Sequence, residues 1–127
     1  MDLELLRAKG AEPVDVRPAV VRGFELRIGA RAAVAPDSAA SVHGLLMKLS
    51  HAELERLYAE PGVRAYRPEP VLAVVPGGAA VPALCYNLPE PPSPEERNPE
   101  YAARLRSLAQ RVGLPDDYIA SIGQPAR

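Results

Sequence analysis

The stretch LYAEPGVRAYRPEPV, residues 57–71, changes from a helical pattern to a strand across a turn. Pro61 and Gly62 favour that turn, and the acidic residue Glu60 precedes them directly. A corner of this kind can direct a carboxylate into a cavity. Glutamate is mostly exposed in proteins, so by position alone Glu60 is more often a solvated loop residue than a catalytic base.

The residues before this corner predict two helices and at least two strands. The first helix covers residues 2–9, with Asp2 as its cap. Ser50 and Glu53 have the spacing of a capping box, which predicts a helix over residues 51–58. Farther upstream, RGFELRIG (22–29) alternates between apolar and polar residues, as a half-buried strand does. We expect a partner segment at 31–36, a loop that starts at Pro36-Asp37, and a second strand over 41–49.

The residues after the corner predict a hairpin and two more helices. Gly77-Gly78 accept a tight turn between strands at 70–76 and 79–88, and Pro82 suggests a bulge or an edge position. The proline-rich segment 89–97 is expected to be a stiff surface connector. We then expect a helix capped by Asn98, with Pro99 at its first position and Gly113 at its end, and a short helix within 114–122. A flexible tail is expected at 123–127.

These elements predict an α+β fold, with a mixed sheet or small barrel decorated by short helices. Long helices do not alternate regularly with the strands, which disfavours a doubly wound parallel sheet. At 127 residues the chain is long enough for one domain and short for two. We expect a single domain over residues 1–122.

Charge and composition exclude several classes of partner. The formal net charge is −1, so there is no broad basic surface for nucleic acid or an anionic membrane. No apolar run approaches the roughly 20 residues of a membrane helix. The single cysteine, Cys85, cannot form an internal disulfide, and the N-terminus lacks the pattern of a secretory signal. Both features lead us to expect a cytoplasmic protein.

Motifs that carry chemistry by themselves are scarce in this sequence. There is no glycine-rich phosphate loop and no Cys/His cluster with metal-ligand spacing, so we expect neither a metal nor an organic cofactor. His43 and His51 are isolated, and Cys85 lies in a strand as a small core residue would. Asp116 and Asp117 are explained by the dipole of the helix that they start.

Four segments, taken together, resemble a known family. They are RGFELRIG, VHGLLMKLSHAELERLYAEPGVRAYRPEPV, VPALCYNL and NPEYAARLRSLAQRVGLPDDYIASI, and they resemble the γ-glutamylcyclotransferase-like, or AIG2-like, family from Met1 to about Ile122. The resemblance implies a mixed β-barrel surrounded by helices, with a cavity for a γ-glutamyl group. Active members convert a γ-glutamyl amide to 5-oxoproline through attack of the α-amine on the γ-carbonyl.

The resemblance also implies roles for particular residues. Glu60 corresponds to the acid/base that must deprotonate the attacking amine and protonate the leaving amine. Tyr66 and Tyr86 are expected to contact the substrate, a small γ-glutamyl molecule. The sequence does not determine which γ-glutamyl compound this is, nor the oligomeric state.

Two departures from the family pattern keep a second interpretation open. The family's first strand ends in a Tyr-Gly-Ser loop, whereas this chain begins just after that point; we expect that Met1 is internal to a longer natural chain, or that another chain supplies the strand. Pro61 separates Glu60 from Gly62, where the family places glutamate directly before glycine. The chain is therefore either a γ-glutamylcyclotransferase-like enzyme or a non-catalytic module of the same fold that binds a small ligand or another protein.

Overall fold

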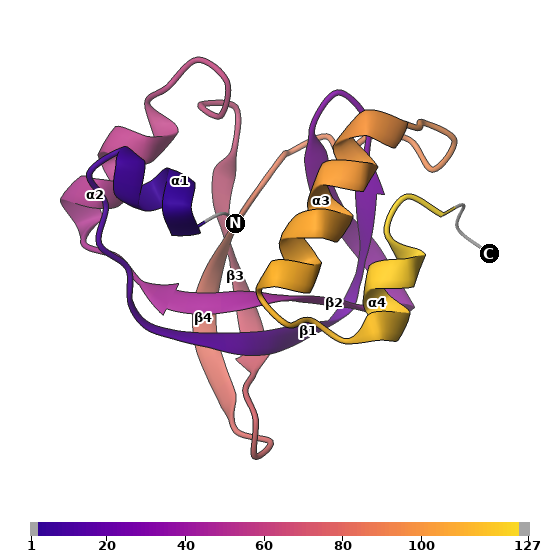
Figure 1. Cartoon of the computed structure of the whole chain (residues 1–127), viewed down its shortest axis with the longest axis horizontal. Coiled ribbons are helices and arrows are strands. Elements are labelled where there is room, and N and C mark those ends of the chain that lie inside the picture. The colour runs from indigo at the N-terminus through magenta and orange to yellow at the C-terminus, as the bar shows by residue number, and fades with distance from the viewer. Residues whose placement is uncertain (1–2, 125–127) are drawn as a thin grey trace.

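The computed structural model describes residues 3–124, which form one antiparallel four-stranded sheet with short helices packed beside it (Figure 1). The strand order is β2-β1-β3-β4, and within these residues the sheet stays open between β2 and β4. The predicted α+β class is confirmed, with an open sheet in place of a closed barrel. The elements are α1 (Leu3–Ala8), β1 (Val14–Ile28), β2 (Ala32–Lys48), α2 (His51–Tyr58), β3 (Arg67–Val74), β4 (Ala80–Asn87), α3 (Pro99–Arg111) and α4 (Asp116–Ser121).

The long hairpin of β1 and β2 is the main difference from the prediction. Shorter strands at 22–29 and 41–49 were expected, but β1 has 15 residues and β2 has 17. The expected loop at Pro36-Asp37 is wrong, because both residues lie within β2. The register shows the reason: Arg22 pairs with Ser41 and Phe24 pairs with Pro36, so residues 37–40 bulge out opposite Gly23 alone.

The local signals for helix ends and for the second hairpin are confirmed. Ser50 Oγ accepts the Glu53 amide at 3.1 Å and the Glu53 carboxylate accepts the Ser50 amide at 2.9 Å, which completes the capping box of α2. Asn98 Oδ1 accepts the Tyr101 amide at 3.2 Å at the start of α3. The expected cap of α1, Asp2, lies outside the described residues.

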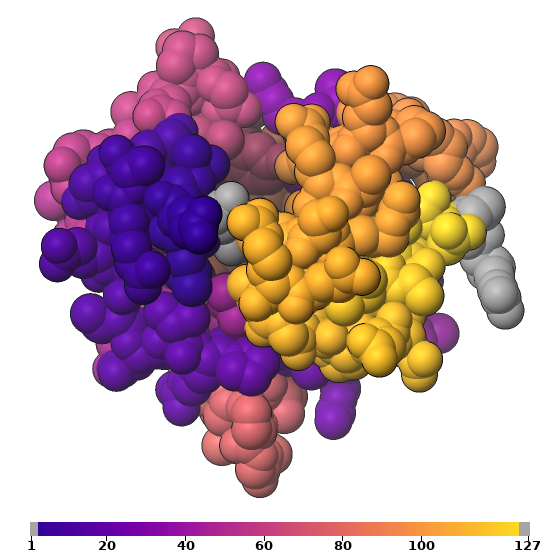
Figure 2. Space-filling model, viewed as in Figure 1, coloured from indigo at the N-terminus to yellow at the C-terminus, as the bar shows by residue number. Residues whose placement is uncertain are grey.

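The β3–β4 hairpin also follows its sequence signals. Gly77 and Gly78 have φ values of 98° and 93°, as its tight turn requires. Pro82 lies in β4, which ends the sheet, so the edge position predicted for this proline is confirmed. The tip of this hairpin projects beyond the helices (Figure 2). No helix within residues 3–124 is long and apolar enough to cross a membrane.

Two pairs of helices cover the two ends of the β1–β2 hairpin. Leu6 and Leu57 of α1 and α2 pack with Met47 and Leu49, near the end of β2. At the other end, α3 and α4 pack against Ile28 of β1. Figures 1 and 2 show the two pairs side by side, α1 and α2 on the left and α3 and α4 on the right. The molecule therefore has separate apolar clusters at its two ends.

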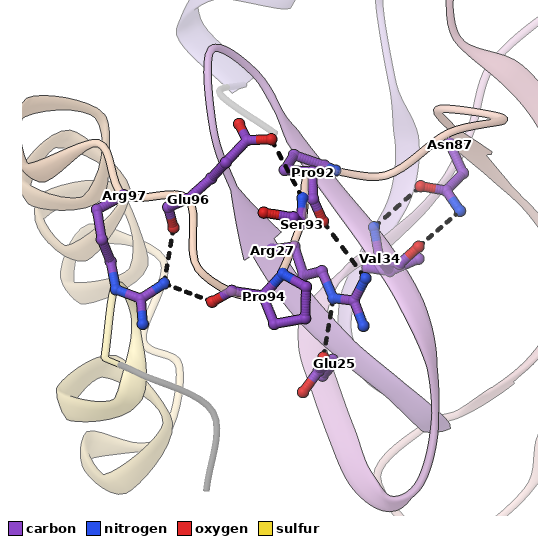
Figure 3. A network of polar contacts seen from close by, with 9 residues as sticks. All are labelled: Glu25, Arg27, Val34, Asn87, Pro92, Ser93, Pro94, Glu96 and Arg97. Carbon is purple, nitrogen blue, oxygen red and sulfur yellow. Dashed lines mark hydrogen bonds and ion pairs between the residues drawn. The ribbon is translucent and has the colours of Figure 1, made fainter.

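The buried side chain of Asn87 links β4 to β2, the two end strands of the sheet. Its Oδ1 accepts the Val34 amide at 2.9 Å and its Nδ2 donates to the Val34 carbonyl at 2.9 Å (Figure 3). The same Nδ2 donates to Oε2 of Glu69 at 2.9 Å. A side-chain amide thus takes the place of a strand neighbour, and the sheet is curled enough for its ends to meet there.

We predict that Asn87→Ala lowers the free energy of unfolding by roughly 1–3 kcal/mol, because it leaves the half-buried Val34 amide and carbonyl without their side-chain partner. Urea denaturation measures the change. Gln124→Ala, which removes an exposed amide, is the matched control and should stay within about 0.5 kcal/mol of the parent protein. Equal stability of the two variants would contradict the role given to Asn87.

Candidate functional site

The corner at residues 60–66 is a compact turn after α2. The Glu60 carbonyl accepts the amides of Val63 at 3.1 Å and Arg64 at 3.0 Å. The Tyr66 amide then donates to the Val63 carbonyl at 3.0 Å, directly before β3 begins. Glu60 and Tyr66, both predicted as site residues, therefore lie at the two ends of one hydrogen-bonded turn.

The Glu60 side chain forms an ion pair with Lys9, which follows α1. Its Oε2 contacts the Lys9 ammonium, and the side chains of Glu60 and Lys9 are 45% and 34% exposed. The carboxylate is thus reachable from solvent and already binds an ammonium group. Sequence reasoning missed Lys9, because the pair joins residues 51 positions apart and no local pattern indicates it.

Tyr66 is half-buried, and its hydroxyl donates to the carbonyl of Ala32 in β2. Burial raises the pKa of this phenol; the nearby Tyr101 adds to the increase and Arg31 opposes it. The hydroxyl therefore stays protonated at neutral pH and serves as a donor. This bond is a second side-chain link between the corner and β2.

Tyr58 and Tyr86 stack face to face beside Tyr66. The ring centroids of Tyr58 and Tyr86 are 3.9 Å apart at an interplanar angle of 10°, and the Tyr58 and Tyr66 centroids are 6.4 Å apart. Burial, helped by Tyr86, raises the pKa of Tyr58 to about 12. We call Tyr58, Tyr66 and Tyr86 the tyrosine cluster. It unites Tyr66 and Tyr86, the two tyrosines predicted as substrate contacts, with Tyr58 from the last position of α2.

The Tyr86 hydroxyl is available to a ligand. It has no hydrogen-bond partner within residues 3–124. Every buried side-chain polar atom in these residues does have a partner, so the Tyr86 hydroxyl is not among the buried atoms. The hydroxyl must therefore reach solvent. Within residues 3–124, no hydrogen bond or ion pair joins the Glu60 carboxylate to the tyrosine cluster. Glu60 and Tyr66 are connected only through the main chain of the 60–66 turn.

The remaining reactive residues carry little chemistry. Burial, together with Glu69, raises the pKa of the Cys85 thiol, which makes it a poor nucleophile. The His43 ring packs 4.7 Å from the Tyr118 ring, and His51 pairs with Glu55 at the surface at 2.9 Å. Across residues 3–124 no three His, Cys, Asp or Glu side chains are grouped as metal ligands.

Two cavities lie elsewhere in the described structure. The larger, about 710 Å³, lies between the β1–β2 hairpin, the 93–98 segment and helices α3 and α4. The smaller, about 500 Å³, follows one side of α3 and includes Tyr101. Neither is lined by Glu60, Tyr66 or Tyr86. The candidate site is thus a surface corner with an ion pair and an aromatic cluster.

We predict that Tyr58→Phe flattens the loss of stability at alkaline pH. The Tyr58 phenol has a pKa of 10 in the unfolded chain and about 12 in the folded protein. Below pH 10 it is protonated in both states, and its contribution to stability is fully present. As the pH rises from 10 to 12 the unfolded chain ionises first, and this contribution is lost. Urea denaturation across this range measures the slope. The slope of the parent protein in Tyr58→Phe would refute the assignment.

Comparisons with known proteins place this fold and corner in context. The sequence matches the family described as gamma-glutamyl cyclotransferase, AIG2-like, over residues 2–104. No curated protein matches at a significant level. A solved structure of a gamma-glutamyl cyclotransferase superposes with a TM-score of 0.78 at 18% identity, over 97% of this chain and 80% of the other.

Two further solved structures share the fold. An uncharacterised protein from Homo sapiens has a TM-score of 0.75 at 20% identity, over 95% of this chain and 78% of its own. A protein from Arabidopsis thaliana has a TM-score of 0.63 at 18% identity, over 91% of this chain and 88% of its own. The family match spans most of the sequence, and the chain belongs to the gamma-glutamyl cyclotransferase, AIG2-like family.

Proposed function

We propose that this chain cyclises a small γ-glutamyl amide to 5-oxoproline and releases an amine or amino acid, with Glu60 as the acid/base. One observation carries the proposal: the Glu60 carboxylate is solvent-accessible and binds an ammonium group, that of Lys9. The α-ammonium of a γ-glutamyl substrate is the same chemical group. Family membership makes the reaction class the natural one to test.

The proposed steps use Glu60 for two proton transfers. Its carboxylate takes a proton from the α-ammonium, and the free amine attacks the γ-carbonyl to form the ring C–N bond. The resulting tetrahedral oxyanion collapses and the original amide C–N bond breaks, while Glu60 returns the proton to the leaving nitrogen. The ring nitrogen then loses its second proton, which the released amine takes up as it leaves as an ammonium. The products are 5-oxoproline and the released amine, and no oxidant or metal takes part in these steps.

Exchange of Lys9 for the substrate ammonium costs little. Both side chains are at least one-third exposed, and ion pairs of this kind contribute about 0–1 kcal/mol. In the proposed complex the Tyr86 hydroxyl, which has no hydrogen-bond partner within residues 3–124, forms a hydrogen bond with the substrate. The substrate also donates a hydrogen bond to the hydroxyl oxygen of Tyr66, whose own proton is donated to Ala32.

The free thiol of Cys85 fits our proposal of a cytoplasmic location.

We predict that the protein releases 5-oxoproline from γ-glutamyl-L-alanine and that Glu60→Gln lowers the rate by about 10²–10⁴-fold, the usual contribution of a general acid/base. Chromatographic assay of 5-oxoproline measures it. Glu55→Gln is the matched control, since Glu55 is an exposed carboxylate of α2 that pairs with His51. Full activity in Glu60→Gln would refute the role of Glu60.

Lys9→Ala provides a separate prediction about the exchange. The variant should leave kcat unchanged and lower KM by no more than about fivefold, because an exposed ion pair contributes at most about 1 kcal/mol. Steady-state kinetics with γ-glutamyl-L-alanine measure both constants, and Lys48→Ala, which breaks the exposed pair of Lys48 with Asp15, is the control. A large fall in kcat would show that Lys9 is required for the chemistry and does not merely occupy Glu60.

A non-catalytic ligand-binding module is the second candidate. It is favoured by the finding that Glu60, Tyr66 and Tyr86 line neither of the two cavities. In that case the protein would release no 5-oxoproline from any γ-glutamyl amide, and Glu60→Gln would change only the affinity for a ligand.

A further inference from the structure

Arg106 of α3 is held in one position at the larger cavity. Its Nη1 donates to the Ile122 carbonyl at 2.8 Å, at the end of α4. A Cβ built on Gly123 would lie 3.2 Å from this Nη1 and 2.7 Å from the Cβ of Ala102, so glycine leaves the space that the guanidinium occupies. Guanidinium has five N–H donors, and the others on Arg106 are uncommitted within residues 3–124.

A second cation in the same cavity also lacks a carboxylate partner. Arg97 donates only to main-chain carbonyls, those of Pro94 at 2.6 Å and Glu96 at 2.7 Å (Figure 3). Arg27, by contrast, is neutralised by Glu25 at 2.9 Å. Among the lining residues of this cavity, two guanidinium groups are thus free to bind an anion.

The cavity also contains carboxylates without a cationic partner. Asp117 lies in the first turn of α4 and lines the cavity. Glu96 also lines it, but its Oε1 accepts the Ser93 amide at 3.2 Å and its Oε2 lies against Gly29. Neither side chain forms an ion pair within residues 3–124. The lining therefore offers unpaired charges of both signs.

Buried apolar side chains also line this cavity. Ile28, Ala102 and Ile122 are 7%, 3% and 4% exposed, and all three line the cavity. Its volume of about 710 Å³ lies within the range of small-molecule sites. The chemistry matches a molecule with a carboxylate, an ammonium and a small apolar body.

We propose that this cavity binds a zwitterionic amino acid or short unmodified peptide, with its carboxylate on Arg106 and Arg97 and its ammonium on Asp117. Guanidinium groups favour planar carboxylates because they donate two parallel hydrogen bonds. The site shares no residue with the corner at Glu60, so it is independent of the proposed cyclisation.

Isothermal titration calorimetry of the full chain with L-alanyl-L-alanine tests the proposal. This peptide has no γ-glutamyl bond, so its binding reports on the cavity whether or not the protein is an enzyme. We expect binding, and we expect N-acetylation or C-terminal amidation of the peptide to weaken it by about 10–100-fold each, since a charged hydrogen bond contributes about 1.5–3 kcal/mol. Acetate and inorganic phosphate should bind far more weakly.

Matched variants assign each charge to its partner. Arg106→Gln should weaken binding of the free peptide by about 10–100-fold, but it should not weaken binding of the C-terminally amidated peptide further. Asp117→Asn should likewise weaken binding of the free peptide by about 10–100-fold, without weakening binding of the N-acetylated peptide further. The controls are Arg104→Gln and Asp116→Asn, neighbouring residues that do not line this cavity. Arg106→Lys, which keeps the charge, covers the case in which Arg106→Gln does not fold.

Three results would overturn the proposal. The first is no heat and no amide chemical-shift change with the free peptide up to about 10 mM, well above the millimolar range of weak binding. The second is equal affinity for acetate or phosphate, which would indicate a plain anion site. The third is the same loss of affinity in the control variants as in Arg106→Gln and Asp117→Asn.

Discussion

The side-chain amide of Asn87 bonds to both main-chain groups of Val34, and the rest of the molecule depends on the curl that this contact holds in the sheet. Main-chain pairing joins β1 to β3 at a single residue pair, Val20 with Val74, so backbone hydrogen bonds alone leave two hairpins loosely connected. Asn87 from β4 and the Tyr66 hydroxyl from the corner both reach β2, at Val34 and Ala32. These contacts fix where the corner and the tyrosine cluster lie relative to the long hairpin.

The long hairpin in turn separates two chemically different regions. At one end α1 and α2 bring together Lys9 and Glu60, with the tyrosine cluster beyond the same turn. At the other end α3 and α4 enclose the larger cavity, where Arg106 and Asp117 carry unpaired charges. Each region is supported by its own apolar cluster, so substitutions in one should have little effect on the other.

Local signals in the sequence predicted the features that depend on neighbouring residues. The Ser50 capping box, the Asn98 cap and the Gly77-Gly78 turn each involve groups within a few positions, and each is present. The full length of β1 and β2 could not be predicted, because the two strands pair on both sides of a bulge at residues 37–40. The sequence at this bulge, which begins at Pro36-Asp37, has the composition of a loop. The Lys9–Glu60 pair was equally out of reach, since 51 residues separate its members. Family resemblance led us to propose site roles for Glu60, Tyr66 and Tyr86, which stay predictions. The stack of Tyr58 on Tyr86 is a tertiary contact that no spacing indicates.

In the proposed function, the Glu60 carboxylate binds the substrate ammonium at the place that Lys9 now occupies. A crystal structure of the Glu60→Gln variant with γ-glutamyl-L-alanine tests this directly, because the variant should hold the substrate without cyclising it. We expect the substrate's α-amino nitrogen within hydrogen-bond distance of the side chain at position 60, with the Lys9 ammonium displaced. A substrate bound elsewhere, with Lys9 still against residue 60, would contradict it.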